Sequence, residues 1–181
     1  MEKEILKRIR RLQEREERER TGLHFVEGIR PVLQATDAGI PFEAWVHSEI
    51  LNRNPVAQKK VRLARVPVER VTPEEFRTIS RTPRASGIGA IVRQHWTRLD
   101  RIDPYRGLCL IAISRLRSPG NLGTIARTAE AVGAGGLIFL GESADPFDPA
   151  AVRASMGGLF RLHLVRTSLE DRKSTRLNSS H

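Results

Sequence analysis

The sequence predicts an α/β fold arranged in two units, and three observations lead to this expectation. Short apolar segments with the character of strands alternate with segments of helical periodicity over most of the chain. Residues 107–113 are apolar almost throughout, which is typical of a strand that is covered on both faces in a parallel sheet. Hydrophobic residues make up 39% of the 181 positions, so the chain can also bury a core.

The segment 1–20 is predicted to form a charged N-terminal helix. Ile5, Ile9 and Leu12 recur at helical spacing, and Glu and Arg alternate at distances that allow ion pairs along one face. Two interpretations stay open at this point. The helix is either a solvated one or one whose arginines contact the phosphates of a nucleic acid. The arginines concerned are Arg8, Arg10, Arg11 and Arg15.

Residues 21–94 are predicted to form a small α/β/α domain, because strands and helices alternate over some 90 residues. The sequence Thr72-Pro73-Glu74-Glu75 is a capping box with proline at the first helical position, so a helix begins there and runs to about Ser80. The predicted strands are 24–26, 42–46, 66–68 and 87–92. The other predicted helices are 31–38 and 56–64.

Residues 95–106 are polar and lack a periodic apolar pattern, so they are predicted to link two domains, with Trp96 packed against one of them. A second α/β unit is predicted over residues 107–170. Its first strand, helix and second strand form a βαβ crossover, which is expected to be right-handed. The predicted strands are 107–113, 137–140 and 159–165. The predicted helices are 121–132 and 149–156.

The chain is basic, with 31 Lys and Arg against 21 Asp and Glu. A surplus of this size favours a polyanionic partner, since each phosphate that a cation neutralises releases condensed counterions. Most of the cations are arginines, and the guanidinium group binds phosphate with two parallel hydrogen bonds. The base composition of the genome can also make a protein rich in arginine, so charge alone does not establish a nucleic-acid partner.

Other residue types narrow the class of protein. Cys109, the only cysteine, is expected to be a small buried hydrophobic residue, and a catalytic thiol there is the minor alternative. A single cysteine fits a reducing compartment, and neither a signal segment nor a run long enough to span a bilayer is found. We therefore expect a soluble cytoplasmic protein without a membrane partner. The histidines lack metal-ligand spacing, so no metal is expected.

The stretch from Ser118 to Ala129 contains the residues of greatest chemical interest. Pro119-Gly120 is expected to turn the chain off a strand end, Asn121 to cap the following helix, and Gly123 to permit close approach of a backbone or ligand. Arg127 follows within two turns and can face the strand ends, where ligands bind in open α/β sheets. The competing interpretation is an ordinary loop and helix with a surface arginine.

This stretch also resembles a known motif. Asn121-Leu-Gly-Thr-Ile-Ala-Arg-Thr-Ala129, followed by Ala131-Val-Gly-Ala134, resembles the first signature motif of the SpoU family of RNA ribose methyltransferases. Arg153-Ala-Ser-Met-Gly-Gly-Leu-Phe160 resembles the segment that follows it in the same proteins. Phe25-Val-Glu-Gly28 and Gly87-Ile-Gly-Ala-Ile-Val92 resemble the substrate-binding domain of that family. The four segments occur in the family's order across residues 5–166.

The resemblance implies a fold, a reaction and a set of residues. The N-terminal domain would hold ribosomal or transfer RNA, and the C-terminal domain would be of the SPOUT class with its trefoil knot. That domain would bind S-adenosylmethionine and act as a homodimer, transferring a methyl group to a ribose 2′-hydroxyl. Arg127 would be the catalytic arginine and would also bind RNA, with Asn121 as its motif partner. Glu27 would anchor the domain rather than react.

A guanidinium group stays protonated in proteins, so Arg127 is an awkward general base. We therefore expect it to position the substrate and to stabilise charge, with proton abstraction as the less favoured role. A non-catalytic RNA-binding module is the main alternative to an enzyme. A nucleotide-binding Rossmann enzyme is disfavoured, because the loop lacks G-x-G-x-x-G and no Walker lysine follows it.

The sequence departs from the family at its end. The family's later motifs, a Gly-Asn-Glu loop and a Ser-Leu-Asn segment, are not found, and these supply most of the cofactor pocket, so no cofactor-binding residue is assigned. Residues 171–181 resemble the translation of a sequencing-adapter oligonucleotide, so they are expected to be non-native and the gene to continue past Glu170. We expect this chain to bind S-adenosylmethionine poorly and to be inactive alone.

Overall fold

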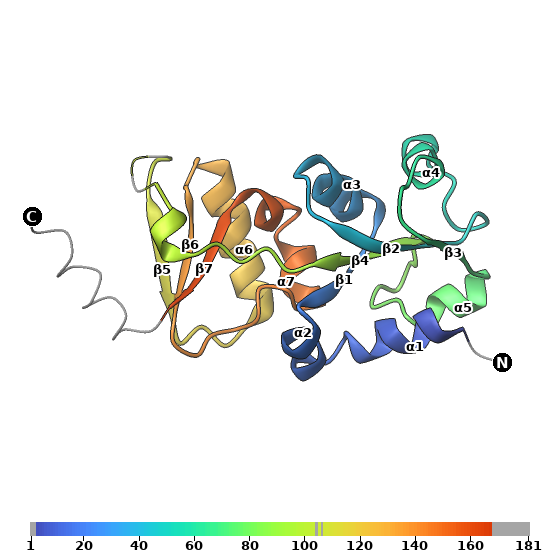
Figure 1. Cartoon of the computed structure of the whole chain (residues 1–181), viewed down its shortest axis with the longest axis horizontal. Helices are drawn as coiled ribbons and strands as arrows, with labels where there is room; N and C mark the ends of the chain where they lie inside the picture. Colours follow the sequence, from blue (N-terminus) through green and yellow to red (C-terminus); the bar gives the residue numbers. More distant parts are fainter. Residues whose placement is uncertain (1–2, 104, 106, 168–181) are drawn as a thin grey trace, which may run out of the picture.

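The computed structural model describes residues 3–103, 105 and 107–167, which form two β-sheets with helices around and between them (Figure 1). The segment 171–181, expected to be non-native, lies outside the described residues. The first sheet has the strand order β1-β4-β2-β3 and the second the order β5-β6-β7. This mixed α/β architecture in two units is the one that the alternation of strands and helices predicts.

The first sheet is mixed. Strand β4 is antiparallel to both of its neighbours, β1 and β2, whereas β2 and β3 are parallel. Its strands are β1 (Leu23–Glu27), β2 (Phe42–His47), β3 (Val68–Arg70) and β4 (Ile88–Arg93). Helices α3 (Ile29–Asp37) and α4 (Pro55–Arg62) cover one face, and α1, α2 and α5 lie along the other (Figure 1).

The expectation of one N-terminal helix is wrong, because the segment forms two helices, α1 (Glu4–Arg11) and α2 (Arg15–Thr21). They are not simply solvated either. Leu6, Ile9 and Leu12 are buried against Phe25 of β1 and Phe76 of α5. The helical spacing of these apolar residues is therefore the spacing of a face that packs onto the sheet.

Helix α5 (Pro73–Arg77) begins with the predicted capping box. The Thr72 hydroxyl accepts a hydrogen bond from the Glu75 backbone N–H at 3.2 Å, and the Glu75 carboxylate accepts one from the Thr72 N–H at 2.8 Å. The helix ends at Arg77, three residues before the predicted end at Ser80. The Ser80 hydroxyl instead donates a hydrogen bond to the Glu27 carboxylate of β1, which holds this residue in the following loop.

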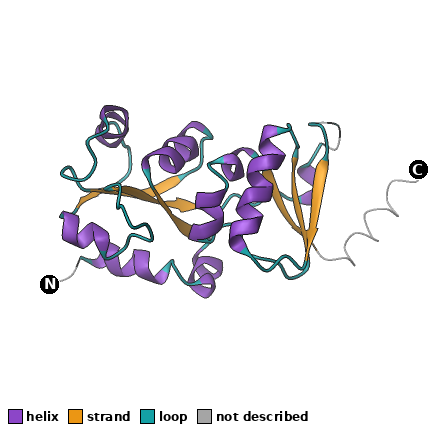
Figure 2. Cartoon of the chain, turned by 180° about the vertical axis from the view of Figure 1, so that it is seen from behind, coloured by secondary structure: helices purple, strands orange, loops and turns teal. Residues whose placement is uncertain are grey.

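The second sheet is parallel throughout, and its register pairs Leu110 with Gly136 and Gly136 with His163. Its strands are β5 (Leu110–Ser114), β6 (Gly136–Leu140) and β7 (His163–Thr167). Helices α6 (Pro119–Ala131) and α7 (Pro149–Ala154) lie between this sheet and the first one (Figure 2). One apolar core consequently runs through both units, from Val26 and Val92 to Leu122 and Leu164.

Two expectations for the second unit are wrong. The strand predicted over 159–165 begins only at His163, because Gly158–Arg161 forms a 3-10 turn (η2) that buries Leu159 and Phe160 in the core. Cys109 is exposed rather than buried. It precedes β5, which is an edge strand of the described sheet with Ala112 exposed, so this strand is not covered on both faces.

The start of the segment between the units, at His95 and Trp96, packs against the second unit. Trp96 packs edge-on against Phe139 of β6 and Phe147, and the Arg166 guanidinium lies over its ring at 4.4 Å. The His95 ring lies 3.0 Å from the Leu159 carbonyl oxygen and can donate to it.

Among the described residues, no helix is both long and apolar enough to cross a membrane. The domain boundaries given above stay predictions.

Candidate functional site

Helix α6 begins at the carboxyl end of β5, as the sequence predicts, but Asn121 is not its cap. Ser118 is the N-cap residue, and its hydroxyl accepts a hydrogen bond from the Asn121 backbone N–H at 3.3 Å. Pro119 follows at the first helical position, where its missing N–H costs nothing. The Asn121 side chain is therefore exposed in the first turn and not engaged in capping.

The inner face of α6 is built from small residues. Gly123, Ala126 and Ala129 are buried together with Leu122, and α7 packs against this face. A Cβ atom at Gly123 would lie 2.3 Å from the Ala151 carbonyl oxygen and 2.6 Å from the Ala154 Cβ. Gly123 thus permits the close approach of a backbone, which is one of the two alternatives expected for it.

Arg127 lies on the outer face of α6 and is exposed. Six residues correspond to about 600° of helical rotation, so its side chain leaves the helix on a different side from Asn121. Within the described part of the chain its guanidinium has no hydrogen-bond or ion-pair partner, and it lines none of the grooves described below. The face of α6 that turns inward packs against α7, and the orientation of Arg127 toward the strand ends stays a prediction.

The carboxyl ends of β5 and β6 border a groove of about 920 Å³. Ligands of open α/β sheets bind at this edge. Three arginines line the groove: Arg15 from α2, and Arg115 and Arg117 from the loop that leads into α6. Arg115 has a φ of 56°, which is uncommon for a residue other than glycine. The acidic residues that line the groove are Glu19 and Glu142.

The four N-terminal arginines differ in their surroundings. Arg8 pairs with Glu43 at 2.9 Å, and Arg11 pairs with Glu17 at 3.2 Å. Arg15 pairs with Glu19 at 3.0 Å, donates a hydrogen bond to the Ser143 carbonyl oxygen at 3.2 Å, and lines the groove. Arg10 is half-buried. Of these four positions, only Arg15 is brought to the carboxyl edge of the second sheet.

Sequence reasoning did not find the buried arginine that joins the two units. Arg18 of α2 is 1% exposed, and its Nε donates to Asp145 Oδ2 at 2.7 Å. Its Nη1 donates to the carbonyl oxygens of Leu12 at 3.0 Å and Gln13 at 2.7 Å, and its Nη2 lies 3.5 Å from Asp148 Oδ2. A buried charge needs such a complete set of partners. No local motif indicates this pair, because 127 residues separate its members.

Two histidines, the buried His24 and the half-buried His95, lie beside this ion pair, among aromatic rings. The ring centroid of His24 of β1 lies 4.8 Å from that of Phe147 and 6.3 Å from that of Phe160, and the His95 ring packs against the same two rings. Burial lowers the pKa of His24 well below its usual value, and a proton on His95 or the charge of Arg18 acts in the same direction. Burial also lowers the pKa of His95. Both rings are therefore neutral in the folded chain at pH 7.

These histidines predict that the chain loses stability in mild acid. Below the unfolded-state pKa of about 6.5, the unfolded chain binds protons that the folded chain excludes, so stability falls as pH falls. The maximal slope is about 1.4 kcal/mol per pH unit for each histidine. Urea unfolding at pH 8, 6.5 and 5.5 measures it, and the slope should be smaller in His24→Leu. Equal slopes in both proteins would contradict the assignment.

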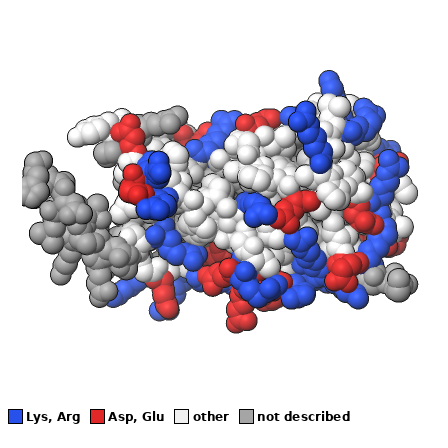
Figure 3. Space-filling model, viewed as in Figure 1, with Lys and Arg blue, Asp and Glu red and all other residues white. Residues whose placement is uncertain are grey.

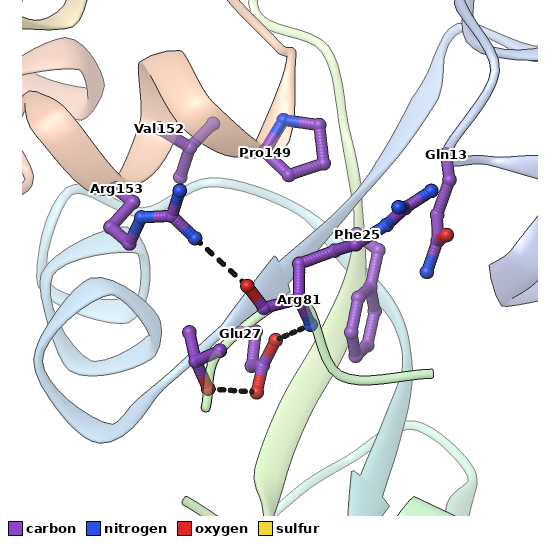
Figure 4. A pocket seen from close by; sticks show the side chains of 8 residues that line it. Gln13, Phe25, Glu27, Arg81, Pro149, Val152 and Arg153 are labelled. Carbon is purple, nitrogen blue, oxygen red and sulfur yellow. Dashed lines mark hydrogen bonds between the residues drawn. The ribbon is translucent and has the colours of Figure 1, made fainter. Parts of the chain in front are cut away.

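The Glu27 carboxylate holds a loop in place through hydrogen bonds. This agrees with the anchoring role that the resemblance implies for Glu27. Its carboxylate accepts hydrogen bonds from the Arg81 N–H at 2.9 Å and the Thr82 hydroxyl at 3.0 Å (Figure 4). Arg153 of α7 reaches across and donates to the Arg81 carbonyl oxygen at 3.3 Å. The cavity between these groups measures about 30 Å³, which is room for water but not for a ligand.

Two family models match the chain in succession. The MRM3-like substrate binding domain matches residues 3–90, which include both N-terminal helices, and the SpoU rRNA Methylase family matches residues 109–178. The chain is 33% identical over 153 residues to the 23S rRNA (uridine(2479)-2′-O)-methyltransferase of Streptomyces viridochromogenes. This match covers 84% of the chain and 53% of that relative. The chain thus spans about half the length of the curated relatives it matches.

Solved structures agree with the sequence matches. The SpoU methyltransferase AviRb from Streptomyces viridochromogenes superposes with a TM-score of 0.82 at 31% identity, covering 98% of this chain and 68% of that one. The AdoMet-bound rRNA methyltransferase from Sinorhizobium meliloti gives a TM-score of 0.84 at 33% identity, covering 96% and 65%. With both units matched in fold, and with the Asn121–Arg127 motif on the helix after β5, the chain belongs to the SpoU family of methyltransferases.

Proposed function

We propose that the protein transfers a methyl group from S-adenosylmethionine to a ribose 2′-hydroxyl of ribosomal RNA. The observation that supports this most is the placement of the motif. Asn121 and Arg127 are exposed on the helix that starts at the carboxyl end of β5, in a chain of this family. Its relatives include methyltransferases of 23S rRNA, which supports ribosomal RNA as the substrate. Transfer RNA is the other substrate class that the sequence leaves open.

Arg127 is proposed as the catalytic arginine. A 2′-hydroxyl is a poor nucleophile until its oxygen is held in line with the methyl group and its proton can leave. The guanidinium stays protonated, so Arg127 would hold the nucleotide through its phosphate and stabilise the charge that develops on the 2′-oxygen. Since its side chain has no partner among the described residues, it can act only on a group brought from outside them. Asn121 would position the same nucleotide.

The arginine-lined groove at the ends of β5 and β6 is proposed to carry the RNA backbone toward α6. Arg15, Arg115 and Arg117 supply guanidinium groups that match phosphate oxygens. Glu19 already neutralises part of the charge of Arg15 at 3.0 Å. Arg8, Arg10 and Arg11 lie outside this groove and are proposed as weaker, peripheral contacts to RNA.

S-adenosylmethionine would supply the methyl group as a sulfonium. Adenosine-sized ligands take enclosed and mostly apolar pockets. The groove at the ends of β5 and β6 does not fit this description, because five of its eleven lining residues are arginines or glutamates. The residues described here therefore do not fit the cofactor by themselves, and we assign them no step that involves it. A homodimer is proposed for the complete protein, and the cytoplasm is its proposed compartment.

The catalytic proposal predicts that Arg127→Lys lowers methyl transfer by about 100-fold, because lysine retains the charge but not the planar fork. The assay follows tritiated methyl groups from S-adenosylmethionine into bacterial ribosomal RNA. It uses the complete gene product, since this chain spans about half the length of its curated relatives. Arg161→Lys is the matched control, as Arg161 is an exposed arginine of the same unit that pairs with Glu130. Near-normal turnover of Arg127→Lys would show that the fork is not required.

A non-catalytic RNA-binding module is the second candidate, because Arg127 lines none of the grooves described above. The same assay separates the two functions. Ribosomal RNA that is bound but never methylated by the complete protein would favour the binding module. Methylation that makes one internucleotide bond resistant to alkali would establish the 2′-hydroxyl as the acceptor.

A further inference from the structure

A second groove lies in the first unit, far from Arg127 in the fold. It measures about 570 Å³ and is formed by α4 together with β2 and β3 near their carboxyl ends. Volumes of this order accommodate small ligands, including a nucleotide. The family's signature motif on α6 does not include it. Its lining divides into an apolar wall, a charged rim and a buried imidazole.

The apolar wall comes from Val61 and Ala64, in and just after α4, and from Val68 of β3. An unstacked base needs such a surface for one of its faces. Arg62 and Arg70 contribute the cations of the rim. The Arg70 side chain is 77% exposed and pairs with Glu49, which is 62% exposed, at 3.3 Å. An exposed pair of this kind is weak, so a phosphate can replace the carboxylate.

His47 is the unusual member of the lining. The residue is 4% exposed, yet its buried Nε2 atom has no hydrogen-bond partner. Leaving a buried polar atom without a partner costs about 1–3 kcal/mol, so such an atom requires an explanation. Burial lowers the pKa of His47, an effect that Glu49 opposes and Arg70 reinforces. The neutral ring has one nitrogen that donates and one that accepts a hydrogen bond.

The surface around the groove is basic. The last turn of α4 contains Lys59, Lys60 and Arg62, and Arg65 follows shortly after. Figure 3 shows Lys and Arg gathered over α4, at the upper right of the molecule. The cations at the rim favour phosphate groups there, because opposite charges attract. The Glu49 carboxylate in the lining disfavours further negative charge, so the part of the ligand inside the groove should be neutral. A nucleotide within a polynucleotide chain has this arrangement.

We propose that this groove binds one unstacked nucleotide of the RNA, with its base against Val61 and Val68, a phosphate on Arg70, and a base or ribose hydroxyl group hydrogen-bonded to His47. The proposal rests on the proposed function, because it takes RNA as the partner. It adds a docking position in the first unit that is separate from the methyl-acceptor position at α6. The Glu49 carboxylate can accept a hydrogen bond from a 2′-hydroxyl, which favours RNA over DNA.

The test measures binding of the 181-residue chain to a fluorescein-labelled single-stranded RNA of 12 nucleotides by anisotropy, as a function of salt. Arg70→Gln should weaken binding about tenfold and reduce the salt slope by about 1, since one phosphate contact is lost. His47→Leu should weaken binding about fivefold without changing the slope, since a neutral hydrogen bond is lost. The DNA of the same sequence should bind more weakly than the RNA.

Arg77→Gln is the matched control, because Arg77 is an exposed arginine on α5 that pairs with Glu74 at 3.4 Å and lies outside the groove. Wild-type affinity in both Arg70→Gln and His47→Leu, or an equal loss in Arg77→Gln, would overturn the proposal. If His47→Leu fails to fold, Arg62→Gln takes its place beside Arg70→Gln. A wild-type chain that binds no RNA would instead count against the proposed function itself.

Discussion

Replacement of Arg18 by methionine is expected to lower the free energy of unfolding by about 3–5 kcal/mol. The substitution retains most of the side-chain volume but removes the guanidinium. The Asp145 carboxylate, which is 6% exposed, then stays buried without its partner at 2.7 Å, and the carbonyl oxygens of Leu12 and Gln13 lose their donor. A buried charge that has lost its partner is among the most destabilising defects in a core. Urea unfolding followed by circular dichroism measures the change.

Two further variants separate this explanation from a general loss of packing. In the double variant Arg18→Met with Asp145→Leu no charge is left buried, so much of the lost stability should return. Arg20→Met removes a neighbouring arginine of α2 whose side chain is 64% exposed, and its partner Glu17 keeps a second ion pair with Arg11. The unfolding midpoint of this variant should stay close to that of the wild type. Similar losses in Arg18→Met and Arg20→Met would contradict the role of the buried pair.

The substitution Gly123→Ala is expected to destabilise the chain by about 1–3 kcal/mol, although alanine is the better helix former by about 1 kcal/mol. The added Cβ would lie 2.3 Å from the Ala151 carbonyl oxygen and 2.9 Å from the Ser155 backbone nitrogen. Both obstacles are backbone atoms of α7 and the residue after it, so α6 and α7 have to separate. Gly123→Leu should be worse still, since its longer side chain needs a larger separation.

Gly120→Ala is the control for this prediction, because it makes the same change one turn earlier in α6. The nearest atom to its added Cβ is the Ser118 Oγ at 3.9 Å, which is ordinary contact. Its stability should equal or exceed that of the wild type in the same urea experiment. A Gly123→Ala protein as stable as Gly120→Ala would show that α6 and α7 do not pack as closely as described.

The elements of the fold could be predicted wherever the signal is local. The capping box at Thr72 is a pattern of neighbouring residues, and α5 begins where this pattern places it. The turn expected at Pro119-Gly120 is wrong, because α6 already begins at Pro119, after its N-cap residue Ser118. The strand predicted over 159–165 begins too early, because the buried apolar pair Leu159-Phe160 has the same pattern in a strand and in a 3-10 turn. The exposure of Cys109 depends on its place beside an edge strand, which the strand's own composition does not reveal.

The site could be predicted only in part. The motif identified the helix that carries Asn121 and Arg127, but not the direction of the arginine. That direction depends on which face of α6 meets α7, and the small residues Gly123 and Ala126 that decide it become informative only once α7 is placed. Arg18 had no signal at all, since an arginine among many in a charged helix differs from its neighbours only through acids contributed by the other unit.

The continuous core and the Arg18 ion pair have a further consequence for substrate choice. They hold the first sheet at a set distance and orientation from α6, so the separation between the groove beside α4 and Arg127 is built into the protein. An RNA can occupy both positions only if its own folding presents two nucleotides at that spacing. Selection of the target would then depend on the three-dimensional shape of the RNA more than on the bases that flank the modified ribose.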